Sequence, residues 1–240
     1  KKMNALNCLL REQDGKNYFI TNPNEMLQDR LEEAKELISK YSQDYDKIFI
    51  AGSFLFSKSF NDIDIFIVQK RGYKETWSMN NHIIFLTEKR LTQPIFQSAS
   101  LISVSNFKIP SKIIKKRPKL NEIMTMYHEA TIEYMNKENK PEAMRNLIFN
   151  YYLFCKNKLL NPVELKKQTE IINLDQIDNF TKRLCRKLFS KSYLYVDIHV
   201  YIKTLAESIK NIKPNQHLIR FKKTYEELIY GKQRSYTGIG

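Results

Sequence analysis

Short apolar runs separated by turn-forming residues occupy roughly the first 110 residues. The runs YFIT (18–21), KIFIAGS (47–53), IDIFIV (63–68), HIIFLTE (82–88) and LISVSNFKI (101–109) are rich in Ile, Phe and Val, so each predicts a strand. IDIFIV is nearly all apolar, which predicts a central strand buried on both faces. Between the first two runs, apolar residues at helical spacing predict a helix over 22–43.

Helical spacing replaces this pattern after Pro110. The basic segment KIPSKIIKKRPKL (108–120) contains two prolines and predicts a linker. Helices are then expected over 120–136, 141–160, 162–172, 174–189, 192–212 and 214–230. The sequence therefore predicts an α+β protein, with a small mixed β-sheet domain over residues 1–110 followed by an α-helical bundle domain over 111–240.

Composition is that of an ordinary globular chain. Of the 240 residues, 42% are hydrophobic and 28% are charged. An apolar run of about 18 residues does not occur, so we expect no membrane span. The sparse, odd set of cysteines (Cys8, Cys155 and Cys185) favours a cytoplasmic protein and argues against a disulfide scaffold. The four histidines (His82, His128, His199 and His217) show no metal-ligand spacing, and none is predicted as a ligand.

The net charge of +14 is unevenly distributed. Residues 1–110 carry 15 Lys and Arg against 13 Asp and Glu, whereas residues 111–240 carry 25 against 13. This asymmetry favours a polyanionic partner for the second half. The basic residues predicted to contact nucleic acid are Lys115, Lys116, Arg117, Arg183, Arg186 and Lys187. Aromatic residues interleave with such positions and could stack bases, although aromatics at helical spacing also serve as core.

The stretch AGSFLFSKSFNDIDIFIV (51–68) contains the strongest chemical signal. Gly52 permits a tight turn, and the segment that follows suits a short helix whose first N–H groups can bind phosphate. Asp62 and Asp64 are two apart on a strand, so their side chains point to one side and repel each other unless a cation neutralises them. Carboxylate oxygens suit Mg²⁺ or Mn²⁺. The alternative is that Asp62 belongs to a turn and Asp64 is solvated on an edge strand.

Gly-Ser, a gap of eight residues and then Asp-x-Asp, set between two apolar strands, resembles the motif of nucleotidyltransferases similar to DNA polymerase β. The resemblance implies that Gly52 and Ser53 hold a nucleoside triphosphate and that Asp62 and Asp64 bind two Mg²⁺ ions. It implies an enzyme that transfers a nucleoside monophosphate to a hydroxyl group, with loss of pyrophosphate. Lys58 is a further candidate for contact with the triphosphate; a solvated helix lysine is the alternative.

The resemblance also implies a third carboxylate on a later strand. Glu88, which closes HIIFLTE, is the candidate, and Asp197 in the helical region is a remote alternative. If there is no third acid, the alternative is a catalytically degenerate protein that binds nucleotide or nucleic acid without turnover. RNA, with tRNA the natural guess, is the favoured acceptor over a protein or small-molecule hydroxyl. The layout also resembles nucleotidyltransferase-like toxins, which implies a protein partner such as an antitoxin.

Overall fold

The computed structural model describes residues 7–11, 17–136 and 142–189. The chain divides into two compact units. Unit 1 comprises Lys1–Lys116 and Leu160–Glu164, and unit 2 comprises Arg117–Leu159 and Leu165–Gly240. The helices predicted over 192–212 and 214–230, together with Asp197, lie outside the described residues.

Unit 1 is built on a seven-stranded sheet with the order β1-β2-β7-β3-β4-β6-β5. The strands are β1 (Asn7–Arg11), β2 (Asn17–Thr21), β3 (Ile48–Ala51), β4 (Ile63–Gln69), β5 (Lys74–Ser78), β6 (Asn81–Thr87) and β7 (Ser103–Ser105). Strands β4 and β6 pair in parallel, and the other neighbouring strands pair antiparallel. The sheet is therefore mixed, and with the helices of the chain it confirms the α+β class in its coarse form.

Strand β4 lies inside the sheet, between β3 and β6. Its side chains alternate between two cores, with Ile65 and Ile67 on one face and Phe66 and Val68 on the other. The prediction that IDIFIV forms a central strand buried on both faces is confirmed. Burial on both faces explains why this run has so few polar residues.

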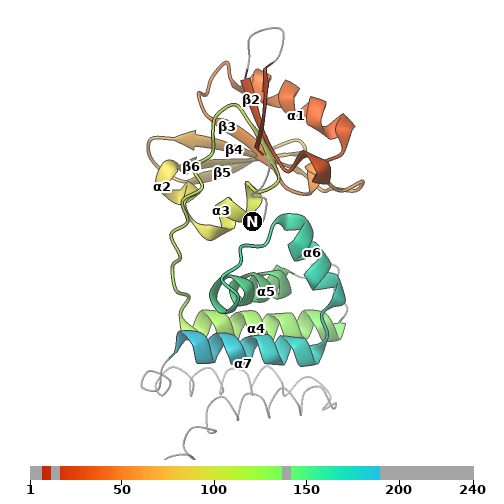
Figure 1. Cartoon of the computed structure of the whole chain (residues 1–240), viewed down its shortest axis with the longest axis vertical. Coiled ribbons are helices and arrows are strands. Elements are labelled where there is room, and N and C mark those ends of the chain that lie inside the picture. Colours follow the sequence, from red (N-terminus) through yellow and green to blue (C-terminus); the bar gives the residue numbers. More distant parts are fainter. Residues whose placement is uncertain (1–6, 12–16, 137–141, 190–240) are drawn as a thin grey trace, which may run out of the picture. The chain divides into compact units, whose positions relative to one another are not determined.

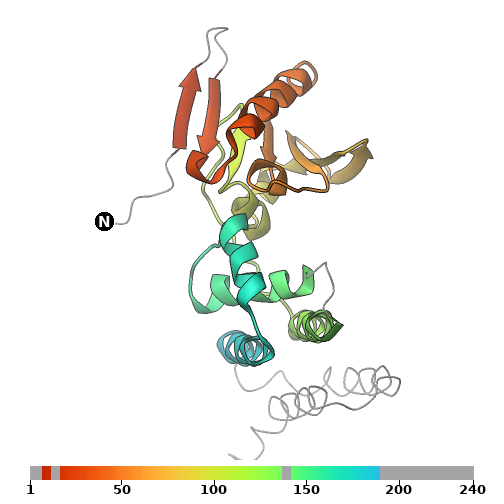
Figure 2. The same cartoon turned by 90° about the vertical axis from the view of Figure 1, so that its right-hand side faces the viewer.

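Helices cover both faces of the sheet. Helix α1 (Gln28–Tyr41) packs Leu31, Ala34 and Ile38 against the face that carries Ile65 and Ile67. Helices α2 (Glu88–Leu91) and α3 (Pro94–Ala99) lie against the opposite face, beside Phe66 and Val68 (Figure 1). Figure 2 shows the antiparallel strands β1 and β2 to the left of α1. We call the face under α2 and α3 the Phe66 face.

Four elements of unit 1 were not predicted, namely β1, β5, α2 and α3. Two further elements are single 3₁₀ turns, η1 (Pro23–Glu25) and η2 (Ser53–Leu55). The helix predicted over 22–43 is thus a 3₁₀ turn followed by α1. The short helix expected after Gly52 is the turn η2.

Unit 2 contains helices, and three of them form its described core. The helices are α4 (Leu120–Asn136), α5 (Glu142–Cys155), α6 (Pro162–Ile171), whose first residues belong to unit 1, and α7 (Leu174–Leu188). Helices α4, α5 and α7 pack on one another, and the buried Tyr127 hydroxyl donates a hydrogen bond to Asp178. None of the helices in the described ranges combines the length and apolar content that a membrane crossing requires.

Candidate metal and nucleotide site

Two acidic side chains meet at the start of β4. Asp64 is the second residue of the strand and alternates onto the Phe66 face, while Ile63 and Ile65 point to the other core. Asp62 precedes the strand by one residue, and the Ile63 N–H donates to the Asn80 carbonyl at 2.9 Å, which fixes the strand entry. The strand period of two therefore brings both carboxylates to one side.

His82 joins the two aspartates from the neighbouring strand. In the parallel register of β4 and β6, His82 stands directly beside Asp64. Its Nδ1 lies 3.0 Å from Asp64 Oδ1, and its Nε2 lies 3.2 Å from Glu75 Oε2 on β5. Each ring nitrogen thus faces a carboxylate oxygen, and those two contacts fix the orientation of the imidazole.

Asp62, Asp64 and His82 together form a candidate ligand set. One ligand atom from each can be chosen so that all three lie within 4.8 Å of one another. Two carboxylates and an imidazole are donors that a divalent cation such as Mn²⁺ accepts, and Mg²⁺ commonly uses one or two carboxylates with phosphate oxygens. The side chains of Asp64 and His82 remain 28% and 16% exposed, so a ligand can reach them.

The electrostatics of Asp64 fit a cation site. The pKa of its carboxyl is raised from 3.8 to about 6, first by burial and second by the neighbouring charge of Asp62. The hydrogen bond from His82 offsets part of this shift. A carboxylate that is costly to ionise gains from a nearby cation, so the fold holds this acid where a metal would stabilise its charged form.

The Gly52–Ser53 turn lies against the same carboxylate. Gly52 follows β3, whose last residue, Ala51, pairs with Asp64. Gly52 has φ 90° and ψ −176°, a backbone conformation that is essentially limited to glycine. A Cβ at this position would lie 2.3 Å from Asp64 Oδ2. Both the conformation and the space therefore require glycine, and Gly52 lies in contact with Asp64.

Ser53 opens η2 directly after this glycine. The Leu55 N–H bonds back to the Gly52 carbonyl and the Ser57 N–H to the Ser53 carbonyl, which closes a tight turn. The first N–H groups of such a turn have no partner within it. Lys58 follows the turn and is exposed. The structure thus places Gly52 against Asp64, with Ser53 next in the chain, and it places Lys58 on the surface.

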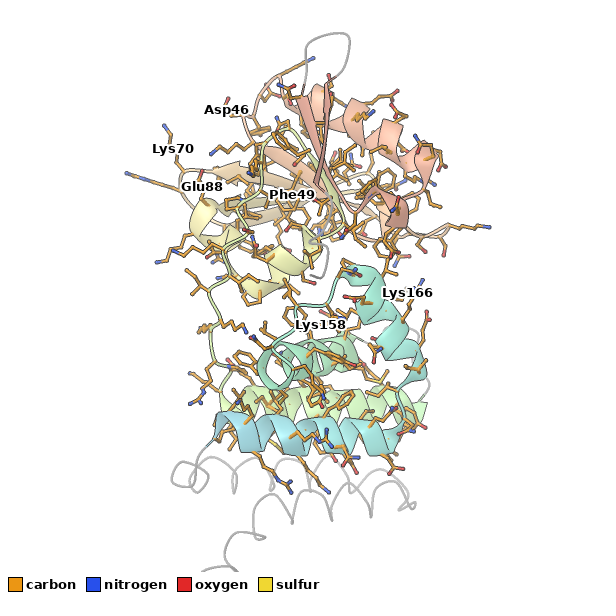
Figure 3. The ribbon with its side chains drawn as sticks, viewed as in Figure 1. Asp46, Phe49, Lys70, Glu88, Lys158 and Lys166 are labelled. Carbon is orange, nitrogen blue, oxygen red and sulfur yellow. The ribbon has the colours of Figure 1, made fainter. Side chains whose placement is uncertain are left out.

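Glu88 lies at the other end of the sheet. Strands β4 and β6 are parallel, so the residue after β6 is six positions, or about 20 Å, beyond His82. Glu88 pairs there with Lys47, near Asp46 and Lys70 (Figure 3). These residues line an open cavity of about 790 Å³. The structure therefore does not bring Glu88 to the aspartates. His82, the first residue of HIIFLTE, lies beside Asp64, and Glu88, the last residue of this run, lies at the opposite end of the strand.

His82 is the residue that the sequence analysis missed. A signal for it exists in hindsight: Asp64 and His82 are each followed by four apolar residues, in DIFIV and HIIFL. Two such runs in parallel register place the leading polar residues side by side. The parallel pairing itself was needed to use that signal, and histidine spacing along the chain could not reveal it.

The predicted basic residues lie on the surface. Lys115 and Lys116 are exposed at the end of the first segment of unit 1, and Arg117 begins unit 2. Arg183, Arg186 and Lys187 are exposed on α7 in unit 2, where the Arg183 guanidinium also donates to the Tyr151 hydroxyl at 3.4 Å. We call the three α7 residues the α7 basic face.

Comparison with known proteins adds no family assignment, since neither a family model nor a curated protein matches this chain.

Proposed function

We propose that this chain is a metal-dependent nucleotidyltransferase, which transfers a nucleoside monophosphate from a nucleoside triphosphate to a hydroxyl acceptor. One observation carries the proposal. The ligand atoms of Asp62, Asp64 and His82 lie within 4.8 Å of one another beside a glycine turn so close that a Cβ would meet Asp64 at 2.3 Å. A cation site and a phosphate-binding turn in contact are the two parts that a metal–triphosphate substrate needs.

In this proposal different residues bind the cation and the phosphates. Asp62 and Asp64 hold the divalent cation, and the Gly52–Ser53 turn offers backbone N–H groups and the Ser53 hydroxyl to phosphate oxygens. Bound Mg²⁺ or Mn²⁺ would supply a Lewis acid that polarises a phosphate oxygen and neutralises charge on the leaving pyrophosphate. Lys58 is close enough in sequence to the turn to add a positive charge for the same phosphates.

We assign to His82 the role for which the family resemblance implies a third carboxylate. It stands on a later strand, within hydrogen-bond distance of Asp64. An imidazole there has two uses, as a nitrogen ligand to the cation or as the base that takes the proton of the attacking hydroxyl. Glu75, at 3.2 Å from Nε2, holds the ring in place for either role.

RNA is the acceptor that the charge distribution favours. The α7 basic face and the exposed Lys115, Lys116 and Arg117 can neutralise phosphates of a backbone.

A second candidate function is nucleotide binding without transfer. It is favoured by the composition of the ligand set, in which the third member among the described residues is a histidine and not an acid. Such a protein would bind ATP with Mg²⁺ and yield no labelled product. Binding and transfer must therefore be measured separately.

The test is a transfer assay with α-labelled nucleoside triphosphates, Mg²⁺ or Mn²⁺, and total RNA. Asp62→Ala and Asp64→Ala should each lower labelling by about 100-fold or more, because each removes a ligand of the charge-stabilising cation. Asp46→Ala is the matched control, an exposed aspartate at the other end of the sheet, and should label like the wild type. Labelling that survives in both site variants contradicts the proposal.

A further inference from the structure

The indole of Trp77 is the most exposed aromatic surface near the proposed site. Trp77 is the only tryptophan in the sequence, and it lies on β5 at the edge of the sheet. Trp77 is 61% exposed. One face of the indole stacks on the His82 ring, with centroids 4.1 Å apart and planes inclined by 6°. The opposite face of the indole is therefore the exposed one.

The strand register connects this indole to the acidic pair. Trp77 pairs with His82 across β5 and β6, and His82 pairs with Asp64 across β6 and β4. The three side chains form a row on the Phe66 face, over two strand spacings or about 10 Å. A nucleoside triphosphate in extended form spans a separation of this kind between its base and its terminal phosphates. A base on the indole and phosphates at Asp64 can thus belong to one molecule.

We propose that Trp77 is the nucleobase platform of this site: the exposed face of the indole stacks the base of the nucleoside triphosphate whose phosphates lie at Asp62, Asp64 and the Gly52–Ser53 turn. The proposal rests on the proposed function and names a subsite within it. Bases stack on aromatic rings in a sequence-tolerant manner, because every base presents a π-face. The platform therefore accepts each of the common nucleoside triphosphates and orients the ribose toward the acidic pair.

A purely structural role for Trp77 makes a different prediction. If the indole only holds His82 in position, its loss should weaken every ligand of the cation site alike. Inorganic tripolyphosphate separates the two roles, because it carries the phosphates of ATP without a base. A ligand that lacks a base gains nothing from a stacking platform.

The experiment measures dissociation constants of ATP and of tripolyphosphate, each with excess Mg²⁺, by calorimetry on the full chain. Trp77→Ala should weaken ATP about tenfold and leave tripolyphosphate within twofold of the wild type. Trp77→Phe should retain part of the ATP affinity, because a smaller aromatic ring still stacks. Met79→Ala, a fully exposed residue on the same hairpin, is the control and should bind both ligands normally. In the wild type, ATP should quench the single tryptophan more than tripolyphosphate does.

Each outcome decides between the claims. Equal weakening of both ligands by Trp77→Ala overturns the platform and assigns Trp77 to the support of His82. No weakening of either ligand overturns the platform and leaves the proposed function intact. If the wild type binds neither ligand in Mg²⁺, the proposed function fails, and the platform fails with it.

Discussion

Asp64 is a carboxyl group held where its charge is unfavourable. It touches the Gly52 turn, faces His82 and lies beside Asp62, and burial raises its pKa to about 6. In the unfolded chain the same group has its ordinary pKa near 3.8. Because the folded pKa is the higher one, the folded state binds more protons between these two values, and stability falls as the pH rises through this window.

Asp64→Asn should therefore stabilise the protein in a pH-dependent way when metal is chelated. Well below pH 3.8 the wild-type carboxyl is protonated in both states, so its ionisation contributes no penalty there. Well above pH 6 it is ionised in both states, and removal of the charge should raise the free energy of unfolding by about 1–3 kcal/mol. Thermal denaturation in EDTA from pH 4 to pH 8 measures this difference between variant and wild type. A difference that is constant with pH, or that shrinks above pH 6, would contradict the assigned shift.

For single residues, the sequence predicts those features of the site that depend on residues close together in the chain. Asp62 and Asp64 share a side because a strand has a period of two, and Gly52 announces a tight turn by its residue type. His82, Glu75 and Trp77 meet these residues only through strand pairing. Glu88 was expected at the site because it is the last residue of HIIFLTE. In the parallel register of β4 and β6 it lies at the end of the sheet away from Asp64.

Helices and strands whose apolar residues repeat at a regular spacing over many positions could be predicted. Short or exposed elements without such a pattern could not. Helix α4 has the predicted bounds, and α6 and α7 lie within one residue of theirs. Strand β5, with the sequence KETWS, is an exposed edge strand and lacks the apolar alternation that signals burial. Helices α2 and α3 span only four and six residues, too few for a helical period to show.

Helix α7 owes its sharp start to a capping box. The Asn173 side chain accepts from the Gln176 N–H, and the Gln176 side chain accepts from the Asn173 N–H, both at 2.9 Å. Asn173→Ala should lower the free energy of unfolding of unit 2 by about 1 kcal/mol. Urea denaturation followed by circular dichroism checks this value.

The matched control for that change is Asn179→Ala, which alters an exposed asparagine inside the same helix. Alanine is the better helix former, so this variant should be as stable as the wild type or more stable by up to about 0.7 kcal/mol. Equal losses in the two variants would show that the box contributes nothing beyond helix propensity.

For the whole molecule, the proposed RNA acceptor predicts a salt-dependent affinity that the α7 basic face controls. Replacing Arg183, Arg186 and Lys187 by Gln should weaken binding of a labelled single-stranded RNA at low salt. Each lost phosphate contact should lower the slope of log affinity against log salt by about 0.7. Fluorescence anisotropy over a salt series measures both effects.

A control with the same loss of charge replaces Lys70, Arg71 and Lys89 in unit 1, all of them exposed. It should leave the slope near that of the wild type if the contacts are local to α7. Equal effects of the two triple variants would assign the binding to net charge and would remove the α7 basic face from the proposal.

The boundary between the two units lies in the basic segment that contains two prolines. Proline and a basic run suggested a boundary after residue 110, and the structure crosses from unit 1 to unit 2 between Lys116 and Arg117. The return of Leu160–Glu164 to unit 1 had no such signal, because a helix start with a proline looks the same in either unit.

Because Leu160–Glu164 belongs to unit 1, it has consequences for truncation of the chain and for folding during synthesis. The Leu160 carbonyl accepts a hydrogen bond from the buried Ser98 hydroxyl at 2.6 Å, and Val163 packs on the core beneath α1. A truncation after residue 116 would strip both contacts from the sheet unit. On the ribosome, unit 1 is completed only once Glu164 is free of the exit tunnel, and by then residues 117–159 of unit 2 have already emerged.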